Sequence, residues 1–270
     1  MSSRKVQPTQ VSEVPQDFEK DHVHAVYDEI ASHFSSTRYK PWPVIAIFLS
    51  SLPTGAVGLD SGTGNGKYLP LPLDRPSGSV WTIGLDRSRN LLEIARRAGD
   101  GPLREVVWGD ALQDCWRWHA FDYAISIATI HHLATEERRR QAVEALIRAV
   151  SPTSGRVLIY VWAVEQDELS KRHIPTEQTA NAGVDVFVPW VLSKANSPSD
   201  APTGESRVYN RYYHMFAQGE LRRLVELAAA EMGLEIGLAD ESSRGRRGLE
   251  IAQDGWERSN YYVELRLWRT

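Results

Sequence analysis

A glycine-rich turn, DSGTGNG at residues 60–66, restricts the fold of this chain more than any other feature. It follows the apolar run Ala56–Leu59, which predicts a buried strand that ends at Asp60. Glycines allow a tight strand-to-helix turn and let a ligand approach the main chain closely. A second apolar run, Val80–Leu85, ends at Asp86, twenty residues after the turn. The spacing predicts a strand–turn–helix–strand unit with a ligand site at the turn.

The acidic residues that follow these strands suit a nucleoside. Asp86 can accept hydrogen bonds from both hydroxyls of a ribose, and Asp110-Ala111, after the next predicted strand, is placed to meet the edge of an adenine. The G-x-G-x-G spacing differs from the dinucleotide pattern G-x-G-x-x-G, and no phosphate-binding lysine–hydroxyl pair follows it. A dehydrogenase is therefore disfavoured, and a nucleoside joined to an amino acid suits the turn better than a pyrophosphate.

Short apolar runs alternate with helical patterns along the rest of the chain. Further predicted strands cover Glu105–Trp108, Phe121–Ile127, Arg156–Trp162 and Tyr261–Leu267, and predicted helices cover Ser88–Ala98, the segment capped by Thr135, and Gln218–Met232. This alternation implies an α/β fold with a parallel sheet covered on both faces. We expect one domain over residues 21–270, a loose arm over residues 1–20, and a mobile insertion at residues 193–206, which are rich in Ser, Pro, Ala and Gly.

Composition sets outer limits on function. The formal net charge of −4 excludes a polycationic nucleic-acid coat protein. The longest strongly apolar run, Val44–Leu49, is far shorter than the roughly 20 residues that cross a bilayer, so no membrane span is expected. The polar N-terminus has no apolar core of a secretory signal. Because Cys115 is the one cysteine, an internal disulfide and a multi-cysteine zinc site are excluded, and we expect a cytoplasmic protein without a bound metal.

This order of features resembles the class I S-adenosylmethionine-dependent methyltransferases. The resemblance implies a Rossmann-like fold with a seven-stranded, mostly parallel sheet in the order 3-2-1-4-5-7-6, helices on both faces, an antiparallel last strand and substrate-side insertions. It also implies S-adenosylmethionine as cofactor, with Gly62, Gly64 and Asn65 at its methionine part, Asp86 at the ribose and Asp110 at the adenine. The expected cofactor-binding residues are Tyr27, Asp60, Gly62, Gly64, Asn65, Asp86, Asp110 and Ala111.

Three segments outside this core are more specific. They are HAVYDEIASHFSSTRYKPWP at 24–43, IHHL at 130–133, and DVFVPW at 185–190, which continues after the insertion as YNRYYHMFAQG at 209–219. Together they resemble the eukaryotic tRNA wobble-uridine carboxymethyl O-methyltransferases, which convert 5-carboxymethyluridine in the anticodon loop to its methyl ester. The resemblance spans roughly residues 20–268. The chain departs from the family pattern at Thr63, where cysteine is usual, and matches it poorly at 193–206 and 244–247.

The chemistry of such a reaction needs positioning more than proton transfer. A carboxylate is already ionised at neutral pH, so it attacks a methyl group without a general base. We therefore expect hydrogen-bond donors around the substrate, with Arg38 and Arg211 holding the carboxylate or a nearby phosphate. His131 is expected to line the methyl-transfer pocket. The expected catalytic residues are Arg38, His131, Arg211 and His214, and the expected substrate-binding residues are Tyr39, Lys40, His132 and Tyr212.

The strand Glu105–Trp108 lies at the sheet edge in the implied strand order. This strand, Glu105, Val106, Val107 and Trp108, is short and mainly apolar, and an edge of this kind invites strand addition from another chain. The resemblance implies such a companion, a small zinc-binding methyltransferase activator protein that forms a heterodimer. The expected partners are therefore this activator and the anticodon loop of a tRNA.

Two other functions remain open at this stage. A methyltransferase that acts on a small carboxylic acid metabolite would share the glycine turn without needing the segments RYKPWP and RYYH. A cofactor-binding scaffold without catalysis would keep the turn as well, although the complete set of glycines and acids argues against it. The histidine pair and Arg211 also allow purely structural interpretations.

Overall fold

The computed structural model describes residues 6–11, 14–37, 40–168, 170, 183–192 and 207–270. Its larger sheet has eight strands in the order β4-β3-β2-β5-β6-β11-β10-β9. These strands are β2 (Ala56–Ser61), β3 (Val80–Asp86), β4 (Val106–Trp108), β5 (Tyr123–Ile127), β6 (Arg156–Trp162), β9 (Glu235–Ile236), β10 (Arg247–Glu257) and β11 (Asn260–Arg269). The turn after β2 and the end of β3 therefore lie side by side, because these strands are parallel neighbours.

Helices cover both faces of this sheet because both faces are apolar. Along β6, Val157 and Ile159 pack with α5 and α6, whereas Leu158 and Tyr160 pack with α3 on the other face. The described helices are α1 (Pro15–Glu19), η1 (Lys20–His24), α2 (Ala25–Thr37), α3 (Pro43–Ser50), α4 (Arg89–Ala95), η2 (Ile130–His132), α5 (Glu136–Ala149), α6 (Glu220–Glu231) and η4 (Glu241–Ser243). None of them combines the length and apolarity needed to cross a membrane.

The strand order implied by the resemblance is confirmed, with β11 antiparallel to both β6 and β10 and β4 at one edge. The expected count of seven strands is wrong. The two-residue strand β9 pairs with the outer side of β10 and makes an eighth. Boundaries also shift: Ser88 caps α4 through Leu91 N, but the helix ends at Ala95, before the predicted Ala98.

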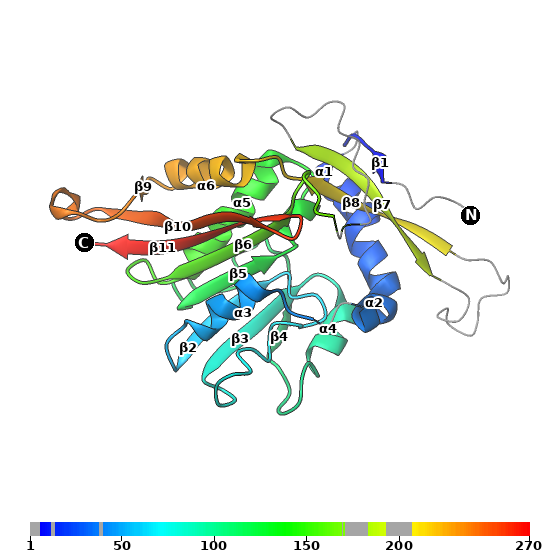
Figure 1. The fold of residues 1–270 in the computed structure, drawn as a ribbon, viewed down its shortest axis with the longest axis horizontal. Coiled ribbons are helices and arrows are strands. Elements are labelled where there is room, and N and C mark those ends of the chain that lie inside the picture. The colour runs from blue at the N-terminus through cyan, green and yellow to red at the C-terminus, as the bar shows by residue number, and fades with distance from the viewer. Residues whose placement is uncertain (1–5, 12–13, 38–39, 169, 171–182, 193–206) are drawn as a thin grey trace.

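A second, smaller sheet was not predicted as such. It is antiparallel and consists of β1 (Gln7–Pro8), β7 (Val184–Leu192) and β8 (Arg207–Met215). Figure 1 shows it on the same side of the molecule as α1 and α2, next to one end of the larger sheet. Most residues of β7 and β8 come from the segments DVFVPW and YNRYYHMFAQG, so these two segments, expected on the substrate side, pair with each other.

The N-terminal residues are not a loose arm where the structure describes them. Gln7 and Pro8 pair with β7, and Phe18 and Glu19 are buried. Glu19 is only 1% exposed; its carboxylate accepts hydrogen bonds from Arg138 Nε at 2.7 Å, from Arg138 Nη2 at 2.6 Å and from Ala134 N at 2.8 Å. A bidentate ion pair thus ties α1 to α5. The insertion expected at 193–206 lies outside the described residues.

The variant Glu19→Ala tests this tie. It leaves a partly buried Arg138 and the Ala134 amide without their acceptor, so we expect the free energy of unfolding to fall by about 2–3 kcal/mol. Urea unfolding followed by circular dichroism measures the change. The matched control is Arg223→Ala, which removes the exposed pair with Glu136 and is expected to leave the unfolding midpoint unchanged. Equal midpoints for Glu19→Ala and the parent would contradict the assignment.

Candidate active site

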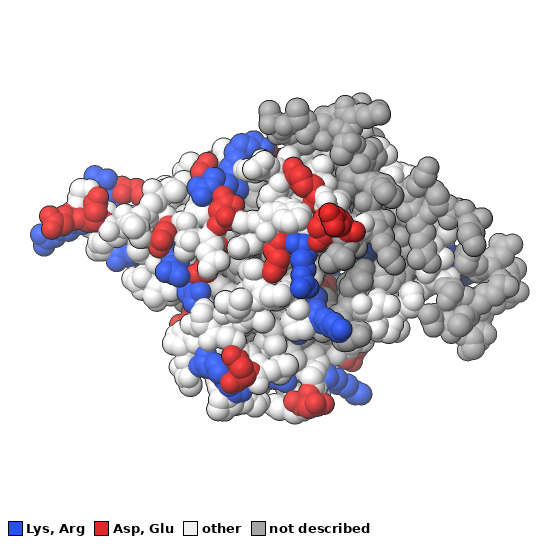
Figure 2. All heavy atoms as spheres, viewed as in Figure 1, with Lys and Arg blue, Asp and Glu red and all other residues white. Residues whose placement is uncertain are grey.

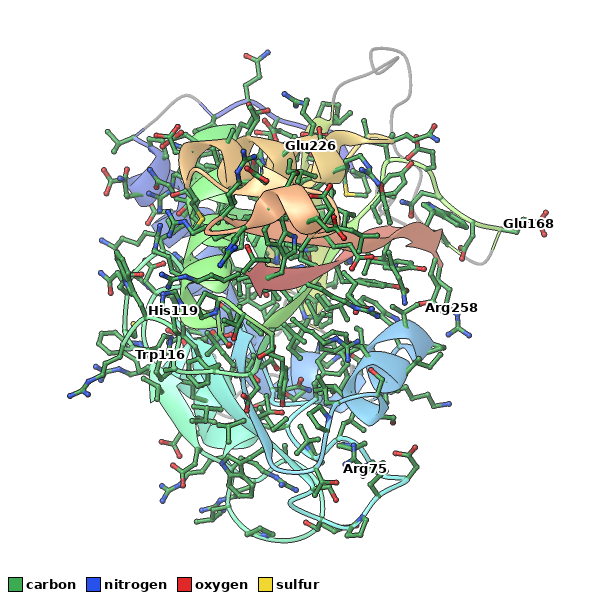
Figure 3. The ribbon with its side chains drawn as sticks, turned by 90° about the vertical axis from the view of Figure 1, so that its left-hand side faces the viewer. Arg75, Trp116, His119, Glu168, Glu226 and Arg258 are labelled. Atoms are coloured by element: carbon green, nitrogen blue, oxygen red, sulfur yellow. The ribbon has the colours of Figure 1, made fainter. Side chains whose placement is uncertain are left out.

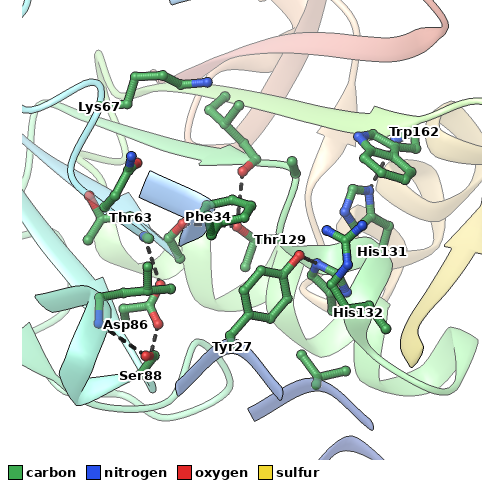
Figure 4. A pocket seen from close by; sticks show the side chains of 18 of the residues that line it. Tyr27, Phe34, Thr63, Lys67, Asp86, Ser88, Thr129, His131, His132 and Trp162 are labelled. Atoms are coloured by element: carbon green, nitrogen blue, oxygen red, sulfur yellow. Dashed lines mark hydrogen bonds between the residues drawn. The ribbon is translucent and has the colours of Figure 1, made fainter. Parts of the chain in front are cut away.

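A cavity of about 770 Å³ opens at the carboxyl ends of the central strands, between the two sheets. In Figure 4, Asp86 and Ser88 lie on one side and His131, His132 and Trp162 on the other, with Tyr27 between them. We call the first side the nucleoside half, lined by Gly62, Gly64, Asn65, Asp86, Asp110 and Ala111. The second is the aromatic half, lined by His131, His132, Trp162, Arg211 and Tyr213. Ligands of open α/β sheets bind at this end of the strands.

The glycine turn is shaped around Asp86. Gly62 and Gly64 have φ values of +85° and +57°, a conformation that favours glycine, and a Cβ on Gly62 would overlap the side chain of Thr129. Gly64 N donates to Asp86 Oδ2 at 2.8 Å, and Ser88 N donates to Asp86 Oδ1 at 2.8 Å. The main-chain N–H of Arg87 bonds to the same carboxylate, and the acceptor capacity that remains suits a hydroxyl, as expected for a ribose.

Asp110 is held in place by Arg87, a residue that the sequence interpretation missed. Arg87 Nη1 donates to Asp110 Oδ2 at 2.6 Å, and Leu112 N donates to Asp110 Oδ1 at 2.9 Å. Asp110, Ala111 and Arg87 all line the nucleoside half. The two oriented carboxylates can accept hydrogen bonds from hydroxyl and amino groups, and the open glycine turn leaves space beside them. These residues therefore fit the nucleoside of S-adenosylmethionine.

Asp60 lies behind the turn instead of in the cavity lining. Its side chain is fully buried, and its Oδ2 accepts a hydrogen bond from Thr63 Oγ1 at 2.7 Å. Burial raises the pKa of Asp60 to about 7, although the bond from Thr63 acts in the opposite direction. Asp60 therefore stabilises the conformation of the turn through its hydrogen bond with Thr63, on the side of the turn away from the cavity.

Helix α2 brings Tyr27 into the cavity because it is fastened to α4. Ser88 Oγ donates to Asp28 Oδ1 at 2.5 Å, and Asn90 Nδ2 donates to the main-chain oxygen of Asp28 at 2.9 Å. Tyr27 then reaches across to the aromatic half, where its hydroxyl lies 3.1 Å from His132 Nε2 and 2.9 Å from the hydroxyl of Tyr213.

The protons in this group can be assigned from its carbonyl partner. His132 Nδ1 lies 2.7 Å from Tyr212 O, which only accepts, so Nδ1 carries the proton. Burial lowers the pKa of His132 to about 3, so the ring is neutral at pH 7 and its Nε2 accepts from Tyr27. Tyr213 must then donate to Tyr27. Both phenol protons are engaged, and none of these three groups carries a charge.

Arg211 supplies the charge of the aromatic half. It is 3% exposed and lies 4.6 Å from the ring of Trp190 and 5.2 Å from the ring of Tyr213. In the parts of the chain that the structure describes, no carboxylate pairs with it, and its Nε has no hydrogen-bond partner. A buried cation without a counter-ion is costly, so this site favours an anion in the cavity.

Alternation along β8 separates four neighbouring residues. Arg211 and Tyr213 line the cavity, whereas Tyr212 and His214 point to the other face and do not. Tyr212 Oη donates to Asp185 Oδ1 at 2.8 Å. His214 lies between two carboxylates, with Nδ1 2.8 Å from Asp185 Oδ1 and Nε2 2.7 Å from Glu220 Oε1.

In this arrangement His214 links β7 to α6 through a hydrogen bond at each ring nitrogen. Since a neutral imidazole has one N–H, both carboxylates can accept a bond only from the doubly protonated ring. Burial alone would raise the pKa of Asp185 and of Glu220, but the bonds and charge of His214 outweigh it and lower both pKa values. His214 is placed to hold the smaller sheet in position, behind the cavity.

The expected site residues thus fall into three groups. Those that line the cavity are Tyr27, Lys40, Gly62, Gly64, Asn65, Asp86, Asp110, Ala111, His131, His132 and Arg211. Asp60, Tyr212 and His214 lie outside its lining, and Arg38 and Tyr39 lie outside the described residues. Sequence interpretation missed Phe34, Trp42, Trp162, Tyr213 and Asn260 as lining residues, although the period of two in RYYH pairs Tyr213 with Arg211. The described residues contain no cluster of three metal-ligating side chains.

Comparisons with known proteins agree with this geometry. A family profile described as a methyltransferase domain matches residues 59–153. The tRNA (carboxymethyluridine(34)-5-O)-methyltransferase of Schizosaccharomyces pombe is 39% identical over 255 residues, which cover 92% of this chain and 96% of that one. The Saccharomyces cerevisiae protein of the same name is 43% identical over 196 residues, 72% of this chain and 65% of that one. The Xenopus tropicalis relative is longer, and the match covers 37% of it.

Solved structures share the fold. The CcbJ methyltransferase from Streptomyces caelestis has a TM-score of 0.60 at 15% identity, covering 90% of this chain and 98% of that one. CalS10, an amino pentose methyltransferase from Micromonospora echinaspora solved with S-adenosylmethionine bound, has a TM-score of 0.55 at 18% identity, covering 89% and 97%. At these identities the likeness establishes the architecture alone.

Asp60→Asn tests the burial of the carboxyl behind the turn. The folded-state pKa of about 7 lies above the ordinary 3.8, so stability from this group is complete below pH 3.8 and is lost as pH rises through 7. Asparagine keeps the acceptor for Thr63 and never ionises. In urea unfolding without ligand, the free energy of unfolding of the variant minus that of the parent should increase between pH 4 and pH 8 by on the order of 1–4 kcal/mol. Asp74→Asn, at an exposed site, should show no such trend; a pH-independent difference for Asp60→Asn would refute the assignment.

Proposed function

This chain belongs to the tRNA (carboxymethyluridine(34)-5-O)-methyltransferase family, and on that premise we propose that it methylates the carboxylate of 5-carboxymethyluridine at the wobble position of a tRNA anticodon. The cofactor is S-adenosylmethionine. The product is the methyl ester. The observation that carries the proposal from the family to this cavity is Arg211, a buried cation that lacks a carboxylate partner among the described residues.

The nucleoside half would hold the cofactor. We assign its methionine part to Gly62, Gly64 and Asn65, its ribose to Asp86 and its adenine to Asp110. When bound, S-adenosylmethionine supplies a methyl group on an electron-poor sulfonium. Lining residues from α2, including Tyr27 and Phe34, stand between this half and the aromatic half, so they are suited to exclude water from the space where the two ligands meet.

The aromatic half would hold the substrate. A carboxylate near its ordinary pKa is ionised at pH 7, so no residue has to remove a proton from it. Arg211 presents N–H donors and a positive charge, whereas His132 is neutral and the phenol protons of Tyr27 and Tyr213 are engaged. Arg211 is therefore the group that would orient the carboxylate. The aromatic faces that flank the guanidinium soften its charge, which leaves the carboxylate nucleophilic.

Other residues complete the proposed site. Nδ1 of His131 accepts a bond from Trp162 N at 3.1 Å, which orients the ring at the end of β6, where methyl transfer would occur. Lys40 lies at the rim and suits a phosphate of the RNA. Arg38 and Tyr39, beside Lys40 in the segment RYKPWP, are assigned to the same anticodon loop. His214 and Tyr212 act through β8 and are positioning residues in this scheme.

We further propose that a small zinc-binding activator protein pairs with β4. Glu105 O accepts from Gly84 N and Gly109 N donates to Asp86 O, so the main-chain groups of Val106 and Trp108 face away from the sheet. Trp108 is 56% exposed, and Leu103 and Trp118 nearby are exposed as well. Apolar side chains along an unpaired strand edge suit strand addition.

Charge gives the partner a second role. The chain carries a net charge of −4, and Figure 2 shows Lys and Arg interspersed with Asp and Glu on the face drawn. RNA affinity depends strongly on cationic contacts with phosphates, so a partner would add positive surface. Figure 3 shows Trp116 and His119 on the side away from Arg258, so a companion on that side leaves the cavity rim near Arg258 open.

We place the enzyme in the cytoplasm. Cys115 is its single cysteine, so folding needs no internal disulfide and suits a reducing compartment. Imaging of the tagged full-length chain measures this directly.

A reconstituted assay tests the proposed function. The protein and its activator are incubated with labelled S-adenosylmethionine and full-length tRNA carrying 5-carboxymethyluridine at position 34, and the ester is measured by nucleoside mass spectrometry. Arg211→Ala should slow single-turnover ester formation about 100-fold, because it removes a charged hydrogen bond to the nucleophile, while calorimetric binding of S-adenosylhomocysteine stays intact. Arg222→Ala, an exposed arginine on α6, is the control. Ester formed on small carboxylic acids and absent from tRNA, or full activity of Arg211→Ala, would overturn the proposal.

The variant Trp108→Glu tests whether the activator binds at the edge strand β4. A charge on the last residue of this short edge strand should weaken association with the activator at least about tenfold in surface plasmon resonance. The control is Trp256→Glu, an exposed tryptophan on β10, which should leave association unchanged. Equal binding by the two variants would count against β4 as the docking strand.

A further inference from the structure

We propose that Asn260 recognises the uracil ring of the substrate by accepting a hydrogen bond from its N3–H. The inference rests on the proposed function and adds to it a residue that selects the base. Asn260 is the first residue of β11, lines the cavity and is 2% exposed. No expectation from the sequence included it.

The orientation of the Asn260 amide is set by the hairpin that precedes it. Its Nδ2 donates to Glu257 O at 3.2 Å and to Arg258 O at 2.6 Å. Turning the amide over would bring Oδ1 against two carbonyl oxygens, so Nδ2 must face the hairpin. Oδ1 therefore faces the other way, and it has no hydrogen-bond partner in the described structure. A buried acceptor of this kind calls for a donor.

The hairpin itself is built to hold this position. Arg258 and Ser259 form its two-residue turn with φ values of 48° and 65°, which non-glycine residues adopt only where their surroundings enforce it. Ala163 N donates to Ser259 O at 3.0 Å, and Asp167 N donates to Ser259 Oγ at 2.8 Å. Figure 3 shows Arg258 extending outward from the tip. Rigid support and an unusual backbone conformation next to a cavity are typical of a recognition element.

The place of Asn260 in the sheet keeps it away from the ribose end of the cofactor. β11 is separated from β3 by β6, β5 and β2, so Asn260 lies roughly 19 Å across the sheet from the end of β3 at Asp86. It pairs instead with Trp162 on β6, and directly opposed residues of an antiparallel pair share one face. Trp162 stacks on Tyr213 with ring centres 4.1 Å apart, and Arg211 lies over Tyr213. An acceptor, two aromatic rings and a cation thus form one wall of the aromatic half.

This wall matches the groups of 5-carboxymethyluridine. Once N1 is bonded to ribose, uracil has one ring N–H donor, at N3, whereas the same position in cytosine is an acceptor. Asn260 Oδ1 would pair with the first and repel the second. With the carboxylate on Arg211 and N3–H on Asn260, the ring would be held at two points against Trp162. A ribose 2′-hydroxyl is the other donor that the substrate offers, and the test below separates the two.

Three full-length tRNAs decide between these possibilities, carrying 5-carboxymethyluridine, its N3-methyl derivative or its 2′-deoxy derivative at the wobble position. The parent enzyme with its activator should esterify the first at least about 100-fold faster than the second in single turnover, because the N3-methyl group leaves Asn260 without a donor. The 2′-deoxy substrate should react at nearly the full rate.

Two substitutions of Asn260 test whether this residue causes the preference for 5-carboxymethyluridine over its N3-methyl derivative. Asn260→Ala and Asn260→Ser should react about 10- to 100-fold more slowly with the natural substrate and lose most of the preference over the N3-methyl substrate. A purely structural role would slow both substrates equally. Gln141→Ala removes a side-chain amide bond to Glu137 on α5, outside the cavity lining, and should keep the full preference.

The outcomes are distinct. Equal rates of the parent enzyme on the 5-carboxymethyluridine tRNA and on its N3-methyl derivative overturn the inference, even if both Asn260 variants fail to fold. A preference that follows the 2′-hydroxyl, or one that survives in Asn260→Ala, overturns it as well. No ester on any of the three tRNAs refutes the proposed function instead, which separates the two failures.

Discussion

A guanidinium buried at the junction of two sheets is the constraint around which this site is arranged. Arg211 comes from β8 of the smaller sheet, and its planar cation rests on Trp190 of β7 and Tyr213 of β8. Tyr213 in turn stacks on Trp162 at the end of β6. Aromatic faces offset part of the cost of burying a charge, and no carboxylate among the described residues pairs with it, which is why we propose that the cavity takes a carboxylate. The larger sheet supplies the opposite character, the two oriented carboxylates of Asp86 and Asp110, which we assign to a nucleoside.

Such a division requires that the two sheets keep one relative position. The residues that fix it lie outside the cavity. His214 joins Asp185 of β7 to Glu220 at the start of α6, and the ion pair of Glu19 with Arg138 fastens α1 to α5. Glu19 and Arg138 are charged groups in largely buried surroundings, where each loses much of its hydration and gains a partner of the opposite sign, and His214 makes a hydrogen bond from each ring nitrogen. The hydrogen bonds of His214 are directional, so they fix the position of β7 and β8 relative to α6.

The reaction proposed for this site explains why its polar groups are donors and acceptors of fixed orientation and not a proton relay. A carboxylate nucleophile arrives ionised, and the neutral His132 has its Nδ1 and Nε2 committed to Tyr212 and Tyr27. What remains for the protein is to align the attacking oxygen, select the base and exclude water. In this scheme selectivity depends on hydrogen-bond geometry at the ends of the aromatic wall.

Local sequence was sufficient for six of the eight strands of the larger sheet and for the glycine turn of the nucleoside half, whereas β9 and β10 were not predicted from it. Residues 60–66 and the acids at the ends of successive strands are close in sequence to the turns they build, so their conformations follow from glycine and from strand periodicity. The aromatic half was only partly accessible. The period of two along RYYH separates Arg211 and Tyr213 from Tyr212 and His214, but only the packing of β8 against η2 and β6 decides which pair faces the cavity. Likewise Asn260, more than 90 residues from Trp162 along the chain, meets it through β11–β6 pairing, and Glu19 meets Arg138 across 119 residues. Local sequence determines the backbone conformation and the side chains that share a face of a strand. The face that is buried, and the element it packs against, depend on the free energy of the whole chain, so only the tertiary structure decided them.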